Sequence, residues 1–380
     1  MSEEFGKDDF YETEEDLGNQ DYKLYNSAVM WNTDWTVGTI INQINKENID
    51  LNPSFQRRNA WDVKKKSKLI ESLLLGIPIP PIILAEVKNE YKTVYLVIDG
   101  KQRLLTIKQF YEESIESVYD PLKLSGLDVL GKLNGKTIVD IKRDALLSVF
   151  LDNLDNQPIR TIIIRGWPNE DFLYTIFLRL NTGSLKLSPQ ELRQALHPGE
   201  FLKYINDYTL NDNPIRRLLK LDKPDARMRD VEFILRYFAF KNYYYSYDGR
   251  LKSFLDNACN ELNEKWIDKS EEIKQQLTEL ENAISFSLEI FGEKDVFKVF
   301  SNNGYYSSLN RTIFDLFTIY FSREENRNAL KDKKELIRNS YEKLLLEDSK
   351  FKEYTSVSTK NKTRTEYRFS TFNKIMDGLK

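Results

Sequence analysis

Residues 97–107, VIDGKQRLLTI, place a glycine and an arginine where an apolar strand gives way to a helix. Gly100 allows a tight turn, and the helix is expected to begin near Lys101 or Gln102. The first turn of a helix offers free backbone N–H groups and the positive end of the helix dipole, which together bind anions. Arg103 lies in that turn and can bind a phosphate through two hydrogen bonds, while Lys101 adds a point charge. The segment predicts a phosphate-binding site, although an ordinary strand–turn–helix with solvated basic residues is also compatible with it.

Asp99 and Gln102 flank this turn and would complete a hydrolytic site. Asp99 ends the strand, where its carboxylate can bind a Mg²⁺ ion or a water molecule. Gln102 lies next to Arg103 and could position an attacking water. The chain contains no GxxxxGK[ST] sequence, so the predicted phosphate site is not a P-loop.

A second polar cluster extends over residues 52–68. Gln56 and Arg57 are expected where a strand enters a loop, a position from which both side chains can point into a pocket. Residues 56–68 contain six basic side chains and one acid. Such a patch favours an anionic partner such as DNA, and a solvated first half of a helix is the alternative. The side chains expected to contact DNA are Lys64, Lys65 and Lys68.

A third cluster follows an apolar-rich helix, DFLYTIFLRLN, which ends at Asn181. Asn181 could line the same site, although helix-end capping explains most of this cluster by itself. Ser188-Pro189-Gln190-Glu191 has the pattern of a capping box with proline at the first helical position. A new helix is therefore expected to start there.

Glu86-Val87-Lys88, at the end of a predicted strand, matches the E-x-K pattern of metal-dependent nucleases. Short matches of this kind occur often by chance in a chain with 30% charged residues. No upstream aspartate is an obvious partner, although Asp62 is available. A nuclease is therefore one of three functional hypotheses for this chain.

The elements that must position these residues are of mixed type before about residue 140 and mostly helical after it. Asp62 is expected to cap a helix over residues 63–75 that Gly76 ends. Strands are expected over residues 82–86 and 94–99 and in the β-branched run IRTIIIRGW. Long amphipathic segments such as DVEFILRYFAF dominate after residue 200. The pattern predicts an N-terminal domain of strands and helices and a helical C-terminal domain.

Composition excludes several classes of protein. Cys259 is the only cysteine and His197 the only histidine among 380 residues. These counts exclude an intramolecular disulfide, a zinc site of several histidines or cysteines, and an HNH nuclease. We expect no zinc and no haem. The sequence shows neither a signal peptide nor an apolar run of the roughly 18–20 residues that a spanning helix needs, so a cytoplasmic location and no membrane partner are expected.

Charge is unevenly distributed around a net charge of −3. Residues 1–22 hold nine acids and one lysine, and residues 351–380 hold seven basic residues and three acids. A flexible acidic arm and a solvated basic tail are the simplest interpretation, and contact between the tail and nucleic acid is the alternative. The tyrosine-rich stretch over residues 243–247 likewise fits either helix packing or a base-stacking surface.

Four blocks in order carry a family resemblance. Together they resemble the N-terminal domain of GmrSD-type modification-dependent restriction endonucleases, and the match covers about residues 35–195. The blocks are PSFQRRNAW (53–61), LIESLLLGIPIPPIIL (69–84), VIDGKQRLLTI (97–107) and FLRLNTGSLKLSPQELR (177–193). That domain is similar to the ParB/sulfiredoxin-like fold. We therefore expect an α+β chain with an acidic arm over residues 1–30, a small mixed-sheet domain over 31–195, and a mostly helical domain with a basic tail over 196–380. The resemblance implies that the domain over 31–195 is ParB-like and binds a nucleotide.

The resemblance also implies a nucleotide site. Related ParB-like domains bind nucleotide phosphates at a G-x-x-R box, and members of this family use a D-G-Q-Q-R block for NTP binding or hydrolysis. Here the block reads DGKQR, with Lys101 in place of the commoner glutamine. The matching polar positions are Gln56, Arg57, Asp99, Gly100, Gln102, Arg103 and Asn181. Glu191 and Arg193 match as well, and capping would explain both.

Full-length enzymes of this type carry an HNH-like nuclease domain that needs histidines. With His197 alone, this chain is expected to be a stand-alone form that works with a separate nuclease chain or without one. The first hypothesis is an NTP-binding and NTP-hydrolysing protein of a restriction or anti-phage system, acting on or with DNA and using Mg²⁺. Lys101 and Arg103 would hold phosphates, and Arg57 would stabilise charge at the γ-phosphate. The second hypothesis is a non-catalytic, nucleotide-gated DNA-binding or regulatory module.

Overall fold

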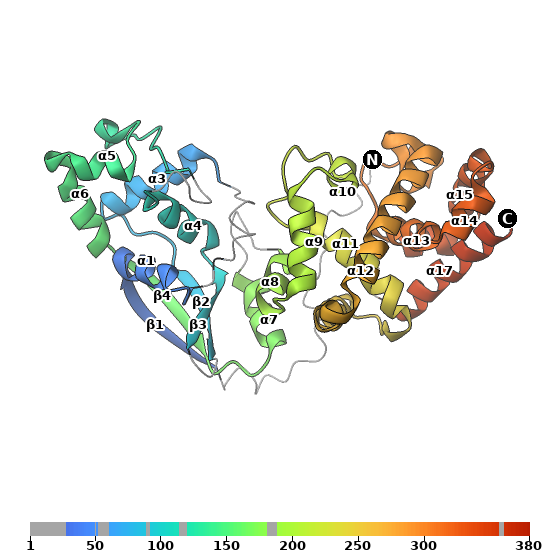
Figure 1. The fold of residues 1–380 in the computed structure, drawn as a ribbon, viewed down its shortest axis with the longest axis horizontal. Coiled ribbons are helices and arrows are strands. Elements are labelled where there is room, and N and C mark those ends of the chain that lie inside the picture. Colours follow the sequence, from blue (N-terminus) through green and yellow to red (C-terminus); the bar gives the residue numbers. More distant parts are fainter. Residues whose placement is uncertain are drawn as a thin grey trace. The chain divides into compact units, whose positions relative to one another are not determined.

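The computed structural model describes residues 28–49, 51, 61–88, 92–113, 120–180, 188–356 and 361–380. These residues form two compact units that divide between Leu196 and His197. We call the described residues from Ala28 to Leu196 the sheet unit and those from His197 to Lys380 the helical unit. Figure 1 shows strands in the first unit and predominantly helices in the second.

Four strands make the sheet of the first unit, in the order β1-β4-β2-β3. Their bounds are β1 (Val29–Thr36), β2 (Ile82–Lys88), β3 (Thr93–Asp99) and β4 (Pro158–Arg165). The pairs β1–β4 and β2–β3 are antiparallel, whereas β2 and β4 run parallel, with Leu84 opposite Ile163. The sheet is therefore mixed. It confirms the expected strands, and β2, expected over residues 82–86, continues to Lys88.

Helices on one side of this sheet enclose the core (Figure 1). They are α1 (Val37–Asn45), α3 (Val63–Leu74), α4 (Lys101–Phe110), α5 (Ile138–Arg143) and α6 (Ala145–Asn156), with a short 3₁₀ turn η3 (Gly131–Leu133). Two further helices, α7 (Glu170–Leu180) and α8 (Pro189–Leu196), contact β3. The edge strand β3 therefore leads into α4 and also contacts α7 and α8, so distant parts of the sequence meet near its carboxyl end.

Local sequence explains where these helices begin. The Asp62 carboxylate accepts a hydrogen bond from the backbone N–H of Lys65 at 2.7 Å, which caps α3 as expected. At α8 the Ser188 N–H donates to Glu191 Oε2 at 2.7 Å, and the Glu191 N–H donates to Ser188 Oγ at 3.1 Å. This reciprocal pair is the capping box that the sequence predicts.

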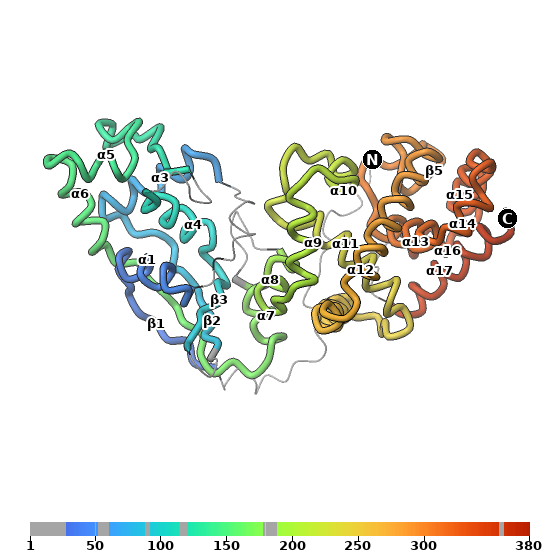
Figure 2. Tube along the Cα trace, in the orientation of Figure 1, coloured from blue at the N-terminus to red at the C-terminus, as the bar shows by residue number. Residues whose placement is uncertain are grey.

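The helical unit consists of helices and one two-residue hairpin, β5 (Phe300–Ser301) with β6 (Gly304–Tyr305) (Figure 2). Its helices are α9 (Glu200–Leu210), α10 (Pro214–Leu218), α11 (Arg229–Tyr243), η4 (Tyr244–Ser246), α12 (Leu251–Asp295), α13 (Arg311–Phe321), α14 (Glu324–Leu330), α15 (Lys334–Glu347), α16 (Ser349–Ser356) and α17 (Lys362–Asp377). The long α12 leaves helical geometry at Lys269 and Gly292. Phe317 of α13 lies among other rings of the core, 4.7 Å from Phe372 and 5.1 Å from Tyr341 between centroids.

The basic C-terminal segment corrects one expectation. It is not a solvated tail, because α17 buries Phe372 and Met376 completely in the core of the helical unit. Arg368 is also buried, and its guanidinium donates to the Tyr354 carbonyl at 2.7 Å. Arg368 is therefore a structural cation, whereas Lys362 and Lys374 of the same helix remain exposed.

The fold class is confirmed: a small mixed sheet with helices is followed by a mostly helical region. No helix within the described ranges is long and apolar enough to cross a bilayer. The predicted acidic arm over residues 1–30 lies almost entirely outside the described residues.

Candidate functional site

The turn between β3 and α4 has the predicted form. Asp99 is the last residue of β3, and Lys101 is the first of α4. Gly100 between them has φ +99°, in the left-handed region that favours glycine, and it provides no capping side chain. The amino end of α4 therefore lies at the carboxyl end of a strand, with its backbone donors uncapped by the residue before it.

Arg103 lies directly behind this turn. One guanidinium nitrogen, Nη2, donates to the Pro81 carbonyl at 3.0 Å and to Asp99 Oδ2 at 3.0 Å. The Nε atom is buried and has no hydrogen-bond partner among the described residues. A buried donor without a partner costs free energy, which an anion or water would recover. The Nε donor of Arg103 is thus unused.

Gly100 is required by contact as well as by its backbone angle. A Cβ atom at this position would lie 3.1 Å from Ile82 Cγ1 and 3.2 Å from Arg103 Nη2. The guanidinium therefore packs against the glycine of the turn. This contact connects Gly100 and Arg103 of the predicted G-x-x-R box.

The two remaining side chains of the turn have different states. The Asp99 carboxylate accepts the Gly100 N–H at 2.7 Å through Oδ1 and Arg103 through Oδ2. It thus orients the arginine. The Oε1 atom of Gln102 is buried and lacks a partner among the described residues. No group of three or more His, Cys, Asp or Glu side chains in the described ranges could hold a metal ion.

Lys101 forms a contact that the sequence did not suggest. Its ammonium is paired with the Glu191 carboxylate of α8, and both side chains are at most 6% exposed. The second oxygen of Glu191 closes the capping box of α8. The charge of Lys101 is therefore already balanced by a carboxylate 90 residues away in sequence, rather than directed to solvent.

Sequence reasoning missed two glutamines of α8. Gln190 and Gln194 are buried, and their Nε2 and Oε1 atoms respectively lack partners among the described residues. The i, i+4 spacing places both on one helical face, adjacent to Glu191. That spacing was the available signal, but on a short helix it does not distinguish a buried polar face from a solvated one.

The lysines predicted to contact DNA lie on α3 and differ from one another. Lys64 and Lys65 are exposed, and the Lys65 ammonium lies 4.9 Å from the centroid of the Trp61 ring. Lys68 is paired with Asp128 and is 3.8 Å from Glu71. Two of the three cations are thus directed to solvent, and the third is held by acids. Gln56, Arg57 and Asn181 lie outside the described residues.

The E-x-K pattern of β2 gains no support from its surroundings. Glu86 is nearly buried, and its carboxylate lies 3.4 Å from Arg165 Nε. The carbonyl of Glu86 accepts the Trp167 indole N–H at 2.8 Å. This carboxylate is therefore used within the sheet unit. His197 is likewise a structural residue, with Nδ1 3.0 Å from Asn260 Oδ1.

Comparison with known proteins gives a family match for the sheet unit. Residues 37–198 match the family model described as the GmrSD restriction endonuclease, N-terminal domain. This segment is similar to the N-terminal domain of GmrSD restriction endonucleases. It contains the whole turn from Asp99 to Arg103, the Lys101–Glu191 pair and the strands β2, β3 and β4, whereas β1 lies entirely before it. No curated protein and no solved structure matches the chain.

The domain associates the chain with restriction and defence. It ends near the division between the two units, so the helical unit lies almost entirely outside the family match.

Proposed function

We propose that this chain binds a nucleoside triphosphate at the β3–α4 turn and hydrolyses it, as part of a restriction or anti-phage defence system that acts on or with DNA. The observation that carries the proposal is the Arg103 guanidinium, which is oriented by Asp99 and has a buried Nε without a described partner. A phosphate oxygen beside the turn would satisfy this donor and the uncapped N–H groups of α4 together.

Lys101 would take part through an exchange of partners. A phosphate at the amino end of α4 competes with Glu191 for the Lys101 ammonium. Because both members of this pair are buried, neither charge can lose its partner without a large cost in free energy. Bound phosphate would thus weaken the Lys101–Glu191 ion pair that joins α4 to α8. A glutamine at position 101 would supply hydrogen bonds but no charge to this exchange.

Hydrolysis needs a positioned water and a stabilised γ-phosphate. The unpartnered Gln102 Oε1 suits a water at the turn. Gln56 is a second candidate for that role. In this proposal Arg57 stabilises the charge that develops in the transition state, and Asn181 is among the nucleotide-binding residues, as its position in the matching block suggests.

Mg²⁺ fits this site with one protein ligand. Protein-bound Mg²⁺ is commonly held by one or two carboxylates together with substrate phosphates, and Asp99 is the carboxylate at this turn. Its side chain is 37% exposed, so one oxygen can be approached from solvent. Bound Mg²⁺ would supply neutralisation of phosphate charge.

DNA is the second partner in this proposal, contacted by the exposed cations Lys64 and Lys65 with Lys68 behind them. A separate nuclease chain in the cytoplasm would perform cleavage. One observation favours the non-catalytic alternative. Asp99 is engaged with Arg103 and Gly100 and is not free to act as a general base. Binding without turnover would identify the chain as a nucleotide-gated module.

The test is phosphate release from ATP, GTP, CTP and UTP with Mg²⁺, with and without DNA. Arg103→Ala should lower turnover by about 10²–10³-fold, the usual effect of removing one donor to developing charge. Arg165→Ala is the matched control, because Arg165 is also paired with a carboxylate of the sheet unit but lies at the other end of β2. Its turnover should equal that of the unmodified chain.

Circular dichroism should show both variants folded. Equal turnover of Arg103→Ala and the unmodified chain would refute the site. No turnover with any nucleotide, together with nucleotide binding that Arg103→Ala abolishes, would establish the non-catalytic alternative.

A further inference from the structure

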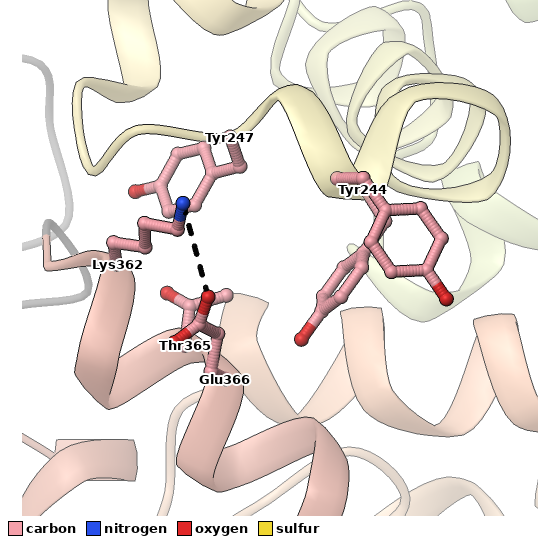
Figure 3. Close-up of a pocket in the computed structure, with 6 residues that line it drawn as sticks. Tyr244, Tyr247, Lys362, Thr365 and Glu366 are labelled. Carbon is pink, nitrogen blue, oxygen red and sulfur yellow. Dashed lines mark ion pairs between the residues drawn. The ribbon is translucent and has the colours of Figure 1, made fainter.

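A small hollow opens in the helical unit, outside the family match. Its lining comes from two segments that are far apart in the sequence, η4 with the residue after it, and the first turns of α17. The lining residues are Tyr244, Tyr245, Tyr247, Lys362, Thr365 and Glu366. Figure 3 shows Tyr244 and Tyr247 on one side and Lys362, Thr365 and Glu366 along α17 on the other.

Two of the tyrosines are fixed by the core. Tyr247 is 3% exposed and lies 5.0 Å from Phe254 between ring centroids. Tyr244 lies 5.0 Å from Phe369 of α17. Rings held in this way lose little conformational freedom when a ligand binds, because their rotamers are already fixed. The hollow therefore has rigid aromatic walls.

Tyr245 differs from both. It is 94% exposed, the highest value among the large apolar and aromatic side chains of the described residues. Its ring meets the Tyr244 ring at 81° with centroids 5.3 Å apart. That single edge contact orients the Tyr245 ring, and its exposure leaves the ring accessible to a flat partner.

The polar groups of the hollow suit a ligand with a charged end and an apolar plane. Lys362 is exposed and lies 4.0 Å from Glu366, which is too long for a hydrogen bond, so the ammonium can contact a second anion (Figure 3). Glu366 can accept from an exocyclic amino group. Sites for single-stranded nucleic acid usually combine aromatic faces, on which bases stack, with cations that neutralise the phosphates of the nucleic acid.

We propose that this hollow binds a base of single-stranded nucleic acid, with the base stacked on Tyr245 and the adjacent phosphate held by Lys362. A duplex does not fit this role, because its bases are stacked on one another and present only their edges. The site does not depend on the nucleotide turn of the sheet unit, so either assignment can fail alone.

The experiment measures binding of the full chain to three fluorescent ligands by anisotropy at low salt: a mixed-sequence single-stranded 12-mer, a 12-mer of abasic sites, and a duplex. The abasic strand keeps the phosphates and removes the stacking. Tyr245→Ala should weaken binding to the single strand by about tenfold, within the range for loss of one base–aromatic stack. Tyr245→Phe keeps the ring and should bind as the unmodified chain does.

The controls separate stacking from charge. Ile267→Ala removes another exposed side chain of the helical unit, 89% exposed on α12, and should change nothing. Lys362→Gln should weaken both strands by similar factors. The proposal is overturned if Tyr245→Ala leaves single-strand binding unchanged, if it weakens the abasic strand equally, or if the duplex binds as tightly and is as sensitive to Tyr245→Ala.

Discussion

Each unit contains a buried or half-buried arginine–aspartate pair, and the two pairs are built differently. In the helical unit, Arg236 and Asp315 are 3% and 4% exposed, and Nε and Nη2 of the arginine each donate to a separate oxygen of the aspartate. In the sheet unit, Arg103 reaches Asp99 through Nη2 alone, its Nε lacks a described partner, and Asp99 is 37% exposed.

The difference separates structural charge from charge kept available for a ligand. The Arg236–Asp315 pair uses both ends of its fork, so a ligand has nothing to add there. Arg103 retains a donor whose unmet hydrogen bond only an additional group can satisfy. Ion pairing alone therefore does not identify a functional arginine. An unused donor does not identify one either, because the Nε atoms of Arg165 and Arg216 are also buried without a hydrogen-bond partner in the described residues. The position of Arg103 behind the β3–α4 turn gives its unused donor a possible ligand.

Breaking the saturated pair should give the largest effect. Arg236→Ala leaves the Asp315 carboxylate buried without its partner, and it should lower the free energy of unfolding by about 3–5 kcal/mol. Urea denaturation followed by circular dichroism measures this loss. The control is Arg217→Ala, which removes a pair of about 70% exposed side chains with Asp212 and should cost less than about 1 kcal/mol. Comparable losses in the two variants would contradict the assignment of Arg236 as a structural charge.

A smaller effect is expected from changing Gly100 in the β3–α4 turn. Gly100→Ala forces a side chain into the left-handed region at φ +99° and brings Cβ to 3.1 Å from Ile82 and 3.2 Å from Arg103. Gly135→Ala is matched in strain, with φ +80°, but its nearest neighbour would be 3.9 Å away. Both should lose about 1–3 kcal/mol from backbone strain. Gly100→Ala alone should also lose nucleotide turnover, since the added methyl displaces the guanidinium.

Turnover that survives in Gly100→Ala, at a level equal to Gly135→Ala, would show that the close contact between Gly100 and Arg103 has no functional role. Thermal unfolding of both variants supplies the stability term, so that loss of activity is not mistaken for loss of fold.

The sequence predicted the frame of the site better than its contacts. Strands rich in β-branched residues and capped helices are local features, which explains why α3, β3, α4 and the start of α8 agree with expectation. The burial of Lys101 against Glu191 depends on where α8 packs, and this contact spans 90 residues. No local pattern encodes such a pairing.

The C-terminal helix shows the same limit in the other direction. Seven basic residues over 351–380 suggested a solvated tail, whereas the intervening Phe369, Phe372 and Met376 anchor α17 in the core. The helical spacing of these apolar residues, and not the net charge of the segment, determines that α17 packs into the core. The tyrosine-rich stretch divides likewise, because Tyr247 is buried and Tyr245 is exposed two residues earlier.

The smallest predicted effect concerns Glu71, a carboxylate whose hydrogen bonds are all made within the protein and which has no proposed ligand. Glu71 of α3 accepts the backbone N–H groups of Val129 and Leu130 at 2.8 Å and of Asp128 at 3.2 Å. Burial acts to raise the pKa of Glu71, but these three donors and Lys68 outweigh it and hold the pKa below its ordinary value of 4.5. Glu71→Gln keeps one acceptor oxygen, so it should cost about 1–2 kcal/mol at pH 7, less than the full value of about 1.5–3 kcal/mol for a hydrogen bond to a charged group.

The pH dependence follows from the direction of that shift. A carboxylate with a lowered folded pKa contributes its stability above the unfolded value and loses it as the pH falls through the folded value. The gap between Glu71→Gln and the unmodified chain should thus be full at pH 7 and 5.5 and should narrow below about pH 4.5. Glu113→Gln, which removes an exposed ion pair with Lys142, should give no such gap. A gap for Glu71→Gln that stays constant down to pH 3.5 would mean that shape, and not hydrogen-bonded charge, makes this side chain structural.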